Sequence, residues 1–337
     1  VMLDNESLPP RSPSKSSIST MEPTSDNEAE SPMTVQQNDS QNNPEPMMSD
    51  GISEPLPYHV LSILQALPGH HGCLQQQEAQ TLKDLRSAVL AWEGKEKYID
   101  CLAMTDEHEE NLLLRFLRAR GFDKDKALKM LQHDVDWRSQ IGLASMCKQP
   151  AEEILGCDPA KIDRYIPLKH IGYDKQGRPV IANHLGGKSV IAEMLDTCTS
   201  LEQLIRYHVW MQESFCRLLT QQSQKLGVKV EQIVVIMDTK GFYLGLFNRR
   251  SQEFLQRIAE VDSNHYPERL GLLVVANASP LISMAWRGIG KLLDERTRQK
   301  IHFTSSPQAA GKVLLEHIEA DMLPKEYGGS APCLDLQ

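Results

Sequence analysis

Hydrophobic residues between about positions 75 and 150 recur three or four residues apart. Two runs show this spacing: Leu112, Leu113, Phe116 and Leu117, followed by Ala127, Leu128, Met130 and Leu131. Such spacing gives an α-helix one apolar face. Gly121 interrupts the first run, and Asp123 has the side chain of an N-cap for the second. We expect a small all-helical cap of three or four helices over residues 75–150.

Short apolar runs of strand length replace this pattern after Pro167. They lie at residues 178–182, 232–237, 270–276 and 300–303. Longer helical segments separate them, near residues 200–224, 246–261, 280–292 and 307–318. Strands that alternate with helices predict crossover connections and a mostly parallel sheet buried on both faces. We therefore expect an α/β lobe over residues 155–330.

The first 55 residues have a different composition from the rest of the chain. They contain no aromatic residue, ten acidic side chains and two basic ones, so they carry −8 of the net charge of −9. Such a segment cannot bury enough apolar surface to offset the entropy of ordering it. We predict that residues 1–55 form a disordered acidic tail, either inert or recruiting a protein partner, with Ser12-Pro13 and Ser31-Pro32 as candidate phosphorylation sites.

Composition also indicates which kinds of partner the protein can bind and in which cellular compartment it works. Residues 56–337 carry a net charge of only −1. This argues against a nucleic-acid binder, which would need a basic face. Seven scattered cysteines without a CxxC spacing are typical of reduced thiols in a cytoplasmic protein, and they suggest no metal site. No apolar run reaches the roughly 20 residues of a spanning helix, and the first residues lack a basic-then-apolar signal sequence. We expect membrane contact to be peripheral.

Enzyme motifs are missing from the sequence. It contains no GxSxG, HExxH or GxGxxG pattern. Asp238-Thr-Lys-Gly241 matches the DxxG element of a GTPase, but no phosphate-cradling loop accompanies it. His70 and His71 lie between Pro68-Gly69 and Gly72 with no carboxylate nearby in sequence, which favours a surface loop over a metal site. We expect a protein that is not an enzyme and uses no cofactor.

Five short motifs occur in order along residues 80–330. They are Phe-Leu-Arg-Ala-Arg ending at Arg120, Asp-Lys-Gln-Gly-Arg-Pro at 174–179, Met-Asp-Thr-Lys-Gly at 237–241, Tyr-Pro-Glu-Arg at 266–269, and Leu-Pro-Lys-Glu-Tyr-Gly-Gly at 323–329. Together they resemble the CRAL-TRIO lipid-binding family, which includes the yeast-type phosphatidylinositol transfer proteins. The resemblance implies a helical cap packed on an α/β lobe whose sheet floors an apolar cavity for one lipid.

The resemblance also implies a movable gate helix over that cavity, at residues 280–293. Its predicted apolar face comprises Leu281, Ile282, Ala285, Trp286 and Ile289. Arg287 and Lys291 add positive charge beside this face, so the helix could lie in the headgroup region of a bilayer. The alternative, without the resemblance, is an ordinary helix facing the core.

Phosphatidylinositol binders of the family carry a set of headgroup residues that this chain retains. The matching positions are Arg120, Asp174, Pro179, Glu268, Thr297 and Lys300. Guanidinium and ammonium groups suit a phosphodiester, and a carboxylate can accept hydrogen bonds from inositol hydroxyls. Gly121 stands where yeast-type proteins have a further basic residue. The alternative is that Arg120 and Glu268 hold the cap to the lobe by ion pairing.

The positions that would hold a choline phospholipid depart from the yeast-type pattern. Ile181, Gln212, Ile233 and Val235 stand where hydroxyl-bearing residues are expected. A more apolar lining suits a sterol, a tocopherol-like molecule or another hydrophobic second ligand, and the sequence leaves its identity open. The resemblance thus implies a protein that exchanges phosphatidylinositol at membrane surfaces. The alternative is a lipid sensor or scaffold that does not transfer lipid.

Overall fold

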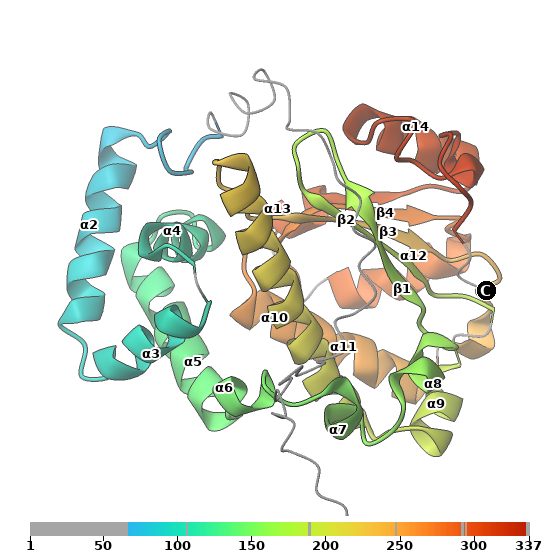
Figure 1. Ribbon diagram of the computed structural model, residues 1–337, viewed down its shortest axis with the longest axis horizontal. Helices are drawn as coiled ribbons and strands as arrows, with labels where there is room; N and C mark the ends of the chain where they lie inside the picture. The colour runs from blue at the N-terminus through green and yellow to red at the C-terminus, as the bar shows by residue number, and fades with distance from the viewer. Residues whose placement is uncertain are drawn as a thin grey trace, which may run out of the picture. The chain divides into compact units, whose positions relative to one another are not determined.

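The computed structural model describes residues 67–105, 107–187, 190–246, 248–290, 293 and 295–334, so the predicted tail lies outside the described residues. The first part of the described chain is helical. Its longer helices are α2 (Gln76–Leu90), α3 (Lys95–Thr105), α4 (Glu109–Ala119) and α5 (Lys124–Gln140). Figure 1 shows them grouped on one side of the long helix α10 (Leu201–Leu226), with the sheet on its other side. We call this helical group the cap.

The turn between α4 and α5 forms as the sequence predicts. Gly121 has a φ of 58°, in the left-handed region that glycine adopts without a steric penalty. The side chain of Asp123 accepts a hydrogen bond from the backbone amide of Lys126 and so caps α5. The apolar residues of both predicted runs join one core, in which Leu113, Leu117 and Leu131 are almost fully buried.

Three short helices lead from the cap to the sheet: α6 (Leu143–Met146), α7 (Ala151–Leu155) and α8 (Pro159–Asp163). The sheet has five strands in the order β1-β2-β3-β4-β5. They are β1 (Leu168–Tyr173), β2 (Pro179–His184), β3 (Ile233–Asp238), β4 (Leu270–Ala276) and β5 (Ile301–Phe303). Strands β2 to β5 run parallel, and β1 pairs antiparallel with β2. The predicted α/β class with a mostly parallel sheet is confirmed.

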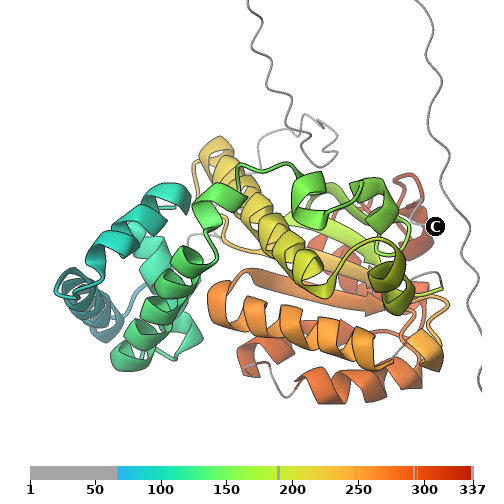
Figure 2. The ribbon, with the colours of Figure 1, turned by 90° about the horizontal axis from the view of Figure 1, so that it is seen from below.

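Helices cover both faces of this sheet (Figures 1 and 2). The remaining helices are α9 (Ile191–Thr197), α11 (Arg249–His265), α12 (Pro280–Ile289), α13 (Glu295–Gln299) and α14 (Pro307–His317), with short 3-10 turns at Leu244–Leu246 and Lys325–Tyr327. Helix α14 packs against one face, and α10 and α12 pack against the other. We call the sheet with its covering helices the lobe.

The two faces of the sheet differ in how completely they are covered. On the α14 face, Val234, Leu272 and Val274 are at most 3% exposed. On the face toward α10 and α12, Val235 and Met237 are only partly buried, although they belong to the central strand β3. This second face is therefore apolar but less tightly covered.

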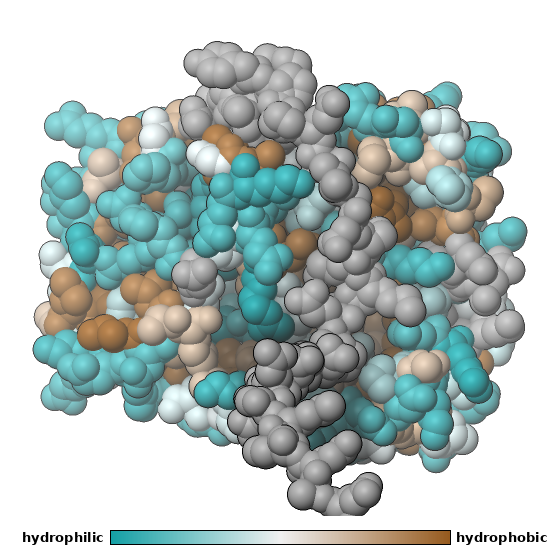
Figure 3. All heavy atoms as spheres, viewed as in Figure 1, coloured by the Kyte–Doolittle hydropathy of each residue, from teal (hydrophilic) through white to brown (hydrophobic). Residues whose placement is uncertain are grey.

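The surface in Figure 3 is mostly hydrophilic, with hydrophobic side chains gathered over the cap at the lower left. Leu90, Ile99 and Met104, at the end of α2 and on α3, are among the exposed large hydrophobic residues. On the lobe, the same class includes Tyr243, Leu281 and Met284. Among the described residues, no helix combines the length and apolar character needed to cross a membrane.

Candidate functional site

Glu268 is the centre of a small charged cluster at the amino end of β4. Its side chain is 4% exposed, and its backbone has a φ of 60°, a strained conformation for a residue other than glycine. Its Oε2 lies 3.2 Å from Nζ of Lys300, and its Oε1 lies 3.4 Å from Nε of Arg296. Both carboxylate oxygens are thus held by cations from the segment that precedes β5.

Arg296 links this cluster to the end of the cap helix α4. Its Nη1 donates a hydrogen bond of 3.3 Å to the backbone carbonyl of Arg118. Arg120 lies two residues further on, where its own Nη1 donates to the carbonyl of Ala119. The Arg118 carbonyl also accepts from the backbone amide of Gly121, and cations gather here because the carboxyl end of a helix carries partial negative charge.

Of the six predicted headgroup residues, the structure places Glu268 and Lys300 in direct contact, while Arg120 and Thr297 belong to the two segments that Arg296 connects. Arg120 lies at the end of α4, Arg296 bridges from there to Glu268, and Lys300 pairs with Glu268. The backbone carbonyl of Thr297 accepts from the amide of Lys300. The sequence analysis did not include Arg296 in this site. Helix α13 ends at Gln299, before Lys300, so no helical spacing linked the two residues in advance.

Asp174 and Pro179 lie in a different local structure, the tight connection between β1 and β2. The Asp174 carboxylate accepts from the backbone amides of Gln176 and Arg178 and from the Arg178 guanidinium. Pro179 begins β2 and pairs with Tyr173. The interactions of Asp174 therefore stabilise the hairpin. A direct role for this pair at the headgroup stays a prediction.

The ion pairing between cap and lobe is carried by other arginines than Arg120. Arg115 binds both oxygens of Glu107 and donates to the carbonyl of Pro267 in the lobe. Arg269 also donates to Glu107, at 2.8 Å. Burial alone would raise the pKa of the Glu107 carboxyl, but Arg115 and Arg269 outweigh it and hold that pKa well below its usual value. Arg118 similarly donates to Glu231, which precedes β3.

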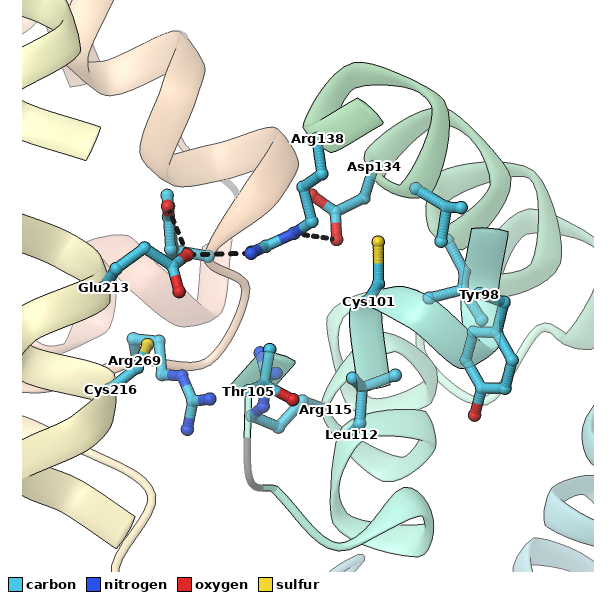
Figure 4. Close-up of a pocket in the computed structure, with 13 residues that line it drawn as sticks. Tyr98, Cys101, Thr105, Leu112, Arg115, Asp134, Arg138, Glu213, Cys216 and Arg269 are labelled. Atoms are coloured by element: carbon cyan, nitrogen blue, oxygen red, sulfur yellow. Dashed lines mark hydrogen bonds and ion pairs between the residues drawn. The ribbon is translucent and has the colours of Figure 1, made fainter. Parts of the chain in front are cut away.

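A second buried network joins α5 to the lobe (Figure 4). Arg138 donates to Asp134 on its own helix and to Glu213 on α10. The hydroxyl of Tyr266 donates to the same Glu213 oxygen at 2.7 Å. A cavity of about 10 Å³ lies between these groups, which is room for roughly one water molecule. This polar cavity is far too small to hold a lipid.

His70 and His71 have partners that their sequence neighbours did not suggest. His70 Nε2 lies 3.4 Å from Glu231, and His71 Nδ1 lies 3.0 Å from Glu110. The fold brings these carboxylates in from helix α4 and from the residues that precede β3. Among the described residues, no group of three or more His, Cys, Asp or Glu side chains is placed to hold a metal ion.

The predicted gate segment contains the helix α12, which packs on the less covered sheet face. Ile282 is 8% exposed and contacts Leu273 and Val275 of β4. The Trp286 ring meets Phe303 of β5 edge to face, with ring centroids 5.5 Å apart. Leu281 and Met284 point outward and are 37% and 51% exposed.

The predicted single apolar face is therefore divided. Ile282 and Trp286 pack inward, whereas Leu281 lies on the exposed side, because a helix this rich in apolar residues has more of them than one contact can cover. The side chains of Ala285 and Ile289 lie outside the described part of the structure. Both sides of α12 thus present apolar side chains.

These observations define a class of protein: a helical cap tied to an α/β lobe whose sheet has one loosely covered apolar face under a short apolar helix. Models of two protein families match the chain. The CRAL/TRIO, N-terminal domain matches residues 81–133, and the CRAL/TRIO domain matches residues 164–329. The chain belongs to the CRAL/TRIO family.

Proteins from two organisms are similar to this chain along most of its length. Identity to the Sec14 cytosolic factor of Schizosaccharomyces pombe is 30% over 288 residues, which are 85% of this chain and 93% of that protein. Identity to the phosphatidylinositol/phosphatidylcholine transfer protein SFH7 of Arabidopsis thaliana is 33% over 239 residues, 70% of this chain and 42% of that protein. The chain thus spans less than half the length of this plant relative.

A solved structure shows the same fold. The crystal structure of Sfh5 superposes with a TM-score of 0.56 at 18% sequence identity, over 71% of this chain and 83% of that one. At this level of identity, the likeness concerns the fold alone.

Proposed function

We propose that this protein binds phosphatidylinositol and exchanges it, and a second hydrophobic lipid, between membrane surfaces. The single observation that carries the proposal is the Glu268–Lys300 pair, which presents a buried carboxylate and a partly buried ammonium at the amino end of the sheet. A carboxylate accepts hydrogen bonds from inositol hydroxyls, and an ammonium binds a phosphodiester. The names of the S. pombe and A. thaliana relatives support the same function.

The acyl chains would lie against the loosely covered face of the sheet, under α12. Val235, Met237 and Phe303 supply apolar surface there. Each buried methylene contributes about 0.8 kcal/mol, so a lipid with two chains is held tightly and leaves only when the cavity opens at a membrane. The exposed Leu281 and Met284 give α12 an apolar side for that contact. No covalent bond is made or broken in such an exchange.

The second lipid is better matched by an apolar molecule than by a choline phospholipid. Ile181 and Ile233 pack with Leu219 of α10, and Val235 lies beside them. These side chains offer no hydrogen-bond donor to a phosphate. We therefore favour a ligand whose affinity comes from apolar contact.

Lys300→Ala tests the proposal. Loss of a charge-assisted contact should weaken phosphatidylinositol binding roughly tenfold to a hundredfold, since such contacts contribute about 1.5–3 kcal/mol. The measurements are native mass spectrometry of copurified lipid and transfer of labelled phosphatidylinositol between vesicles. Lys312→Ala, at an exposed position on α14, is the matched control. Unchanged phosphatidylinositol transfer by Lys300→Ala would contradict the proposal.

A scaffold that does not transfer lipid is the second candidate. The acidic residues 1–55 favour it, because a charged segment of this composition is suited to recruiting a protein partner. Protein that copurifies with lipid but fails to move it between vesicles would support this function instead.

A further inference from the structure

The carboxylate of Glu268 is already engaged on both oxygens by side chains of the chain itself. Lys300 pairs with Oε2 at 3.2 Å and Arg296 with Oε1 at 3.4 Å. The Glu268 side chain is only 4% exposed, so each of its oxygens needs a donor or cation to offset the cost of burying its charge. An inositol hydroxyl that binds Glu268 must therefore share or replace one of these two partners.

The two cations are held very differently. Lys300 is 18% exposed and directly precedes β5, and its backbone carbonyl accepts from Leu273 of β4 at 2.8 Å. Arg296 is 48% exposed and lies on the five-residue helix α13, away from the sheet hydrogen bonds. Its contact with Glu268 is also the longer of the two. Arg296 is accordingly the partner that is easier to displace.

Arg296 keeps a second hydrogen-bond partner when it leaves Glu268. Its Nη1 donates to the carbonyl of Arg118 at the end of α4, while the contact to Glu268 is made by Nε. A rotation within the side chain can release the carboxylate and keep the guanidinium at the negative end of that helix. The exchange therefore requires no rearrangement of the backbone.

We propose that Arg296 determines the selectivity between lipids because it pairs with Glu268 Oε1 whenever no inositol hydroxyl binds that oxygen. When the cavity holds a lipid whose headgroup has no hydrogen-bond donor, Arg296 satisfies Oε1. When it holds phosphatidylinositol, a headgroup hydroxyl takes that oxygen and Arg296 turns to Arg118. The arginine thus stabilises the states without phosphatidylinositol and lowers the preference for it. This inference rests on the proposed function, because it requires Glu268 to contact the inositol.

The experiment compares the full chain with Arg296→Met and with Arg298→Met as the matched control. Arg298 lies on the same helix, is equally exposed and pairs with Glu295 one turn away. Each protein is equilibrated with vesicles that contain phosphatidylinositol, and native mass spectrometry counts the protein with and without bound phosphatidylinositol. Arg296→Met should raise the ratio of protein with bound phosphatidylinositol to protein without it about fivefold, the scale of a partly exposed ion pair. Arg298→Met should leave it unchanged.

Glu268→Gln separates the failure of this inference from the failure of the proposed function. If Glu268→Gln lowers the proportion of protein with bound phosphatidylinositol while Arg296→Met leaves it unchanged or lowers it, the proposed role of Arg296 is overturned. The headgroup site then remains. If Glu268→Gln leaves phosphatidylinositol binding intact, the headgroup site itself is wrong. The double variant should show the low ratio of Glu268→Gln, because without the charged carboxylate there is nothing for Arg296 to occupy. Thermal midpoints of all variants check that they fold.

Discussion

Arg138 in the cap and Glu213 in the lobe are joined by a hydrogen bond of 2.7 Å between Nη1 and Oε1. Both side chains are 8% exposed, and the carbonyl of His265 and the carboxylate of Asp134 accept from the same guanidinium. Burial by itself would lower the pKa of Arg138, but Asp134 and Glu213 outweigh it and raise that pKa. This one side chain therefore connects α5, α10 and the end of α11.

Arg138→Met should destabilise the protein strongly. Removing one partner of a buried ion pair leaves an uncompensated charge and typically costs about 3–5 kcal/mol. The thermal midpoint should fall by at least about 6 °C for a fold of this size. Arg257→Met is the control, because Arg257 pairs with Glu202 at an exposed site, and such pairs contribute less than about 1 kcal/mol. Similar midpoints for the two variants would show that the buried network does not hold the cap.

Stability should decrease as the pH falls from about 7.5 to 5.5. Burial lowers the pKa of His265, more than its hydrogen bond to Asp134 raises it, and burial also lowers the pKa of His70. The unfolded chain then binds more protons than the native state below the ordinary histidine pKa of about 6.5, so stability is lost on acidification. Urea unfolding at several pH values measures this. His265→Gln should make the free energy of unfolding depend less steeply on pH. An unchanged dependence would show that His265 does not contribute to it.

Deleting residues 1–55 should leave lipid binding unchanged and the thermal midpoint within about 2 °C, since the segment lacks the apolar residues for a core. Calorimetry of the full chain and the shortened one gives the comparison. A larger drop would mean that the segment docks on the folded part.

Trp286→Asp tests the gate. If α12 enters the headgroup region of a bilayer, a charge at this position is costly there, and transfer between vesicles should slow at least about tenfold. Lipid bound during expression should stay bound. Because Trp286 also packs on Phe303, the substitution could instead lower the yield of folded protein.

Met284→Asp resolves that ambiguity, since Met284 is 51% exposed and its replacement removes less buried contact than that of Trp286. It should slow transfer without changing the thermal midpoint. Emission from Trp286 should shift to the blue on mixing with anionic vesicles. Normal transfer by the Met284 variant would show that another surface meets the membrane.

The sequence by itself determined the class of fold, because the spacing of apolar residues along the chain indicates helices and strands without tertiary information. The run at 270–276 predicted β4 with its observed bounds, and the strand predicted at 232–237 begins and ends one residue later as β3. The strand β1 escaped prediction, since Lys169, His170 and Gly172 interrupt its apolar pattern, and its pairing with β2 comes from the turn at Asp174. Short strands stabilised by a neighbour leave little trace in one sequence.

The tertiary structure alone decided which charged residues meet. Motif positions pointed to Glu268 and Lys300, 32 residues apart in the chain, but no spacing could show that Arg296 shares the same carboxylate or reaches the carbonyl of Arg118. Likewise, sequence reasoning placed Arg120 as a candidate cap-to-lobe contact, whereas Arg115, Arg118 and Arg138 make those contacts. Hydrophobic burial is read from local periodicity, but ion pairing depends on where distant elements place their side chains once the core has packed.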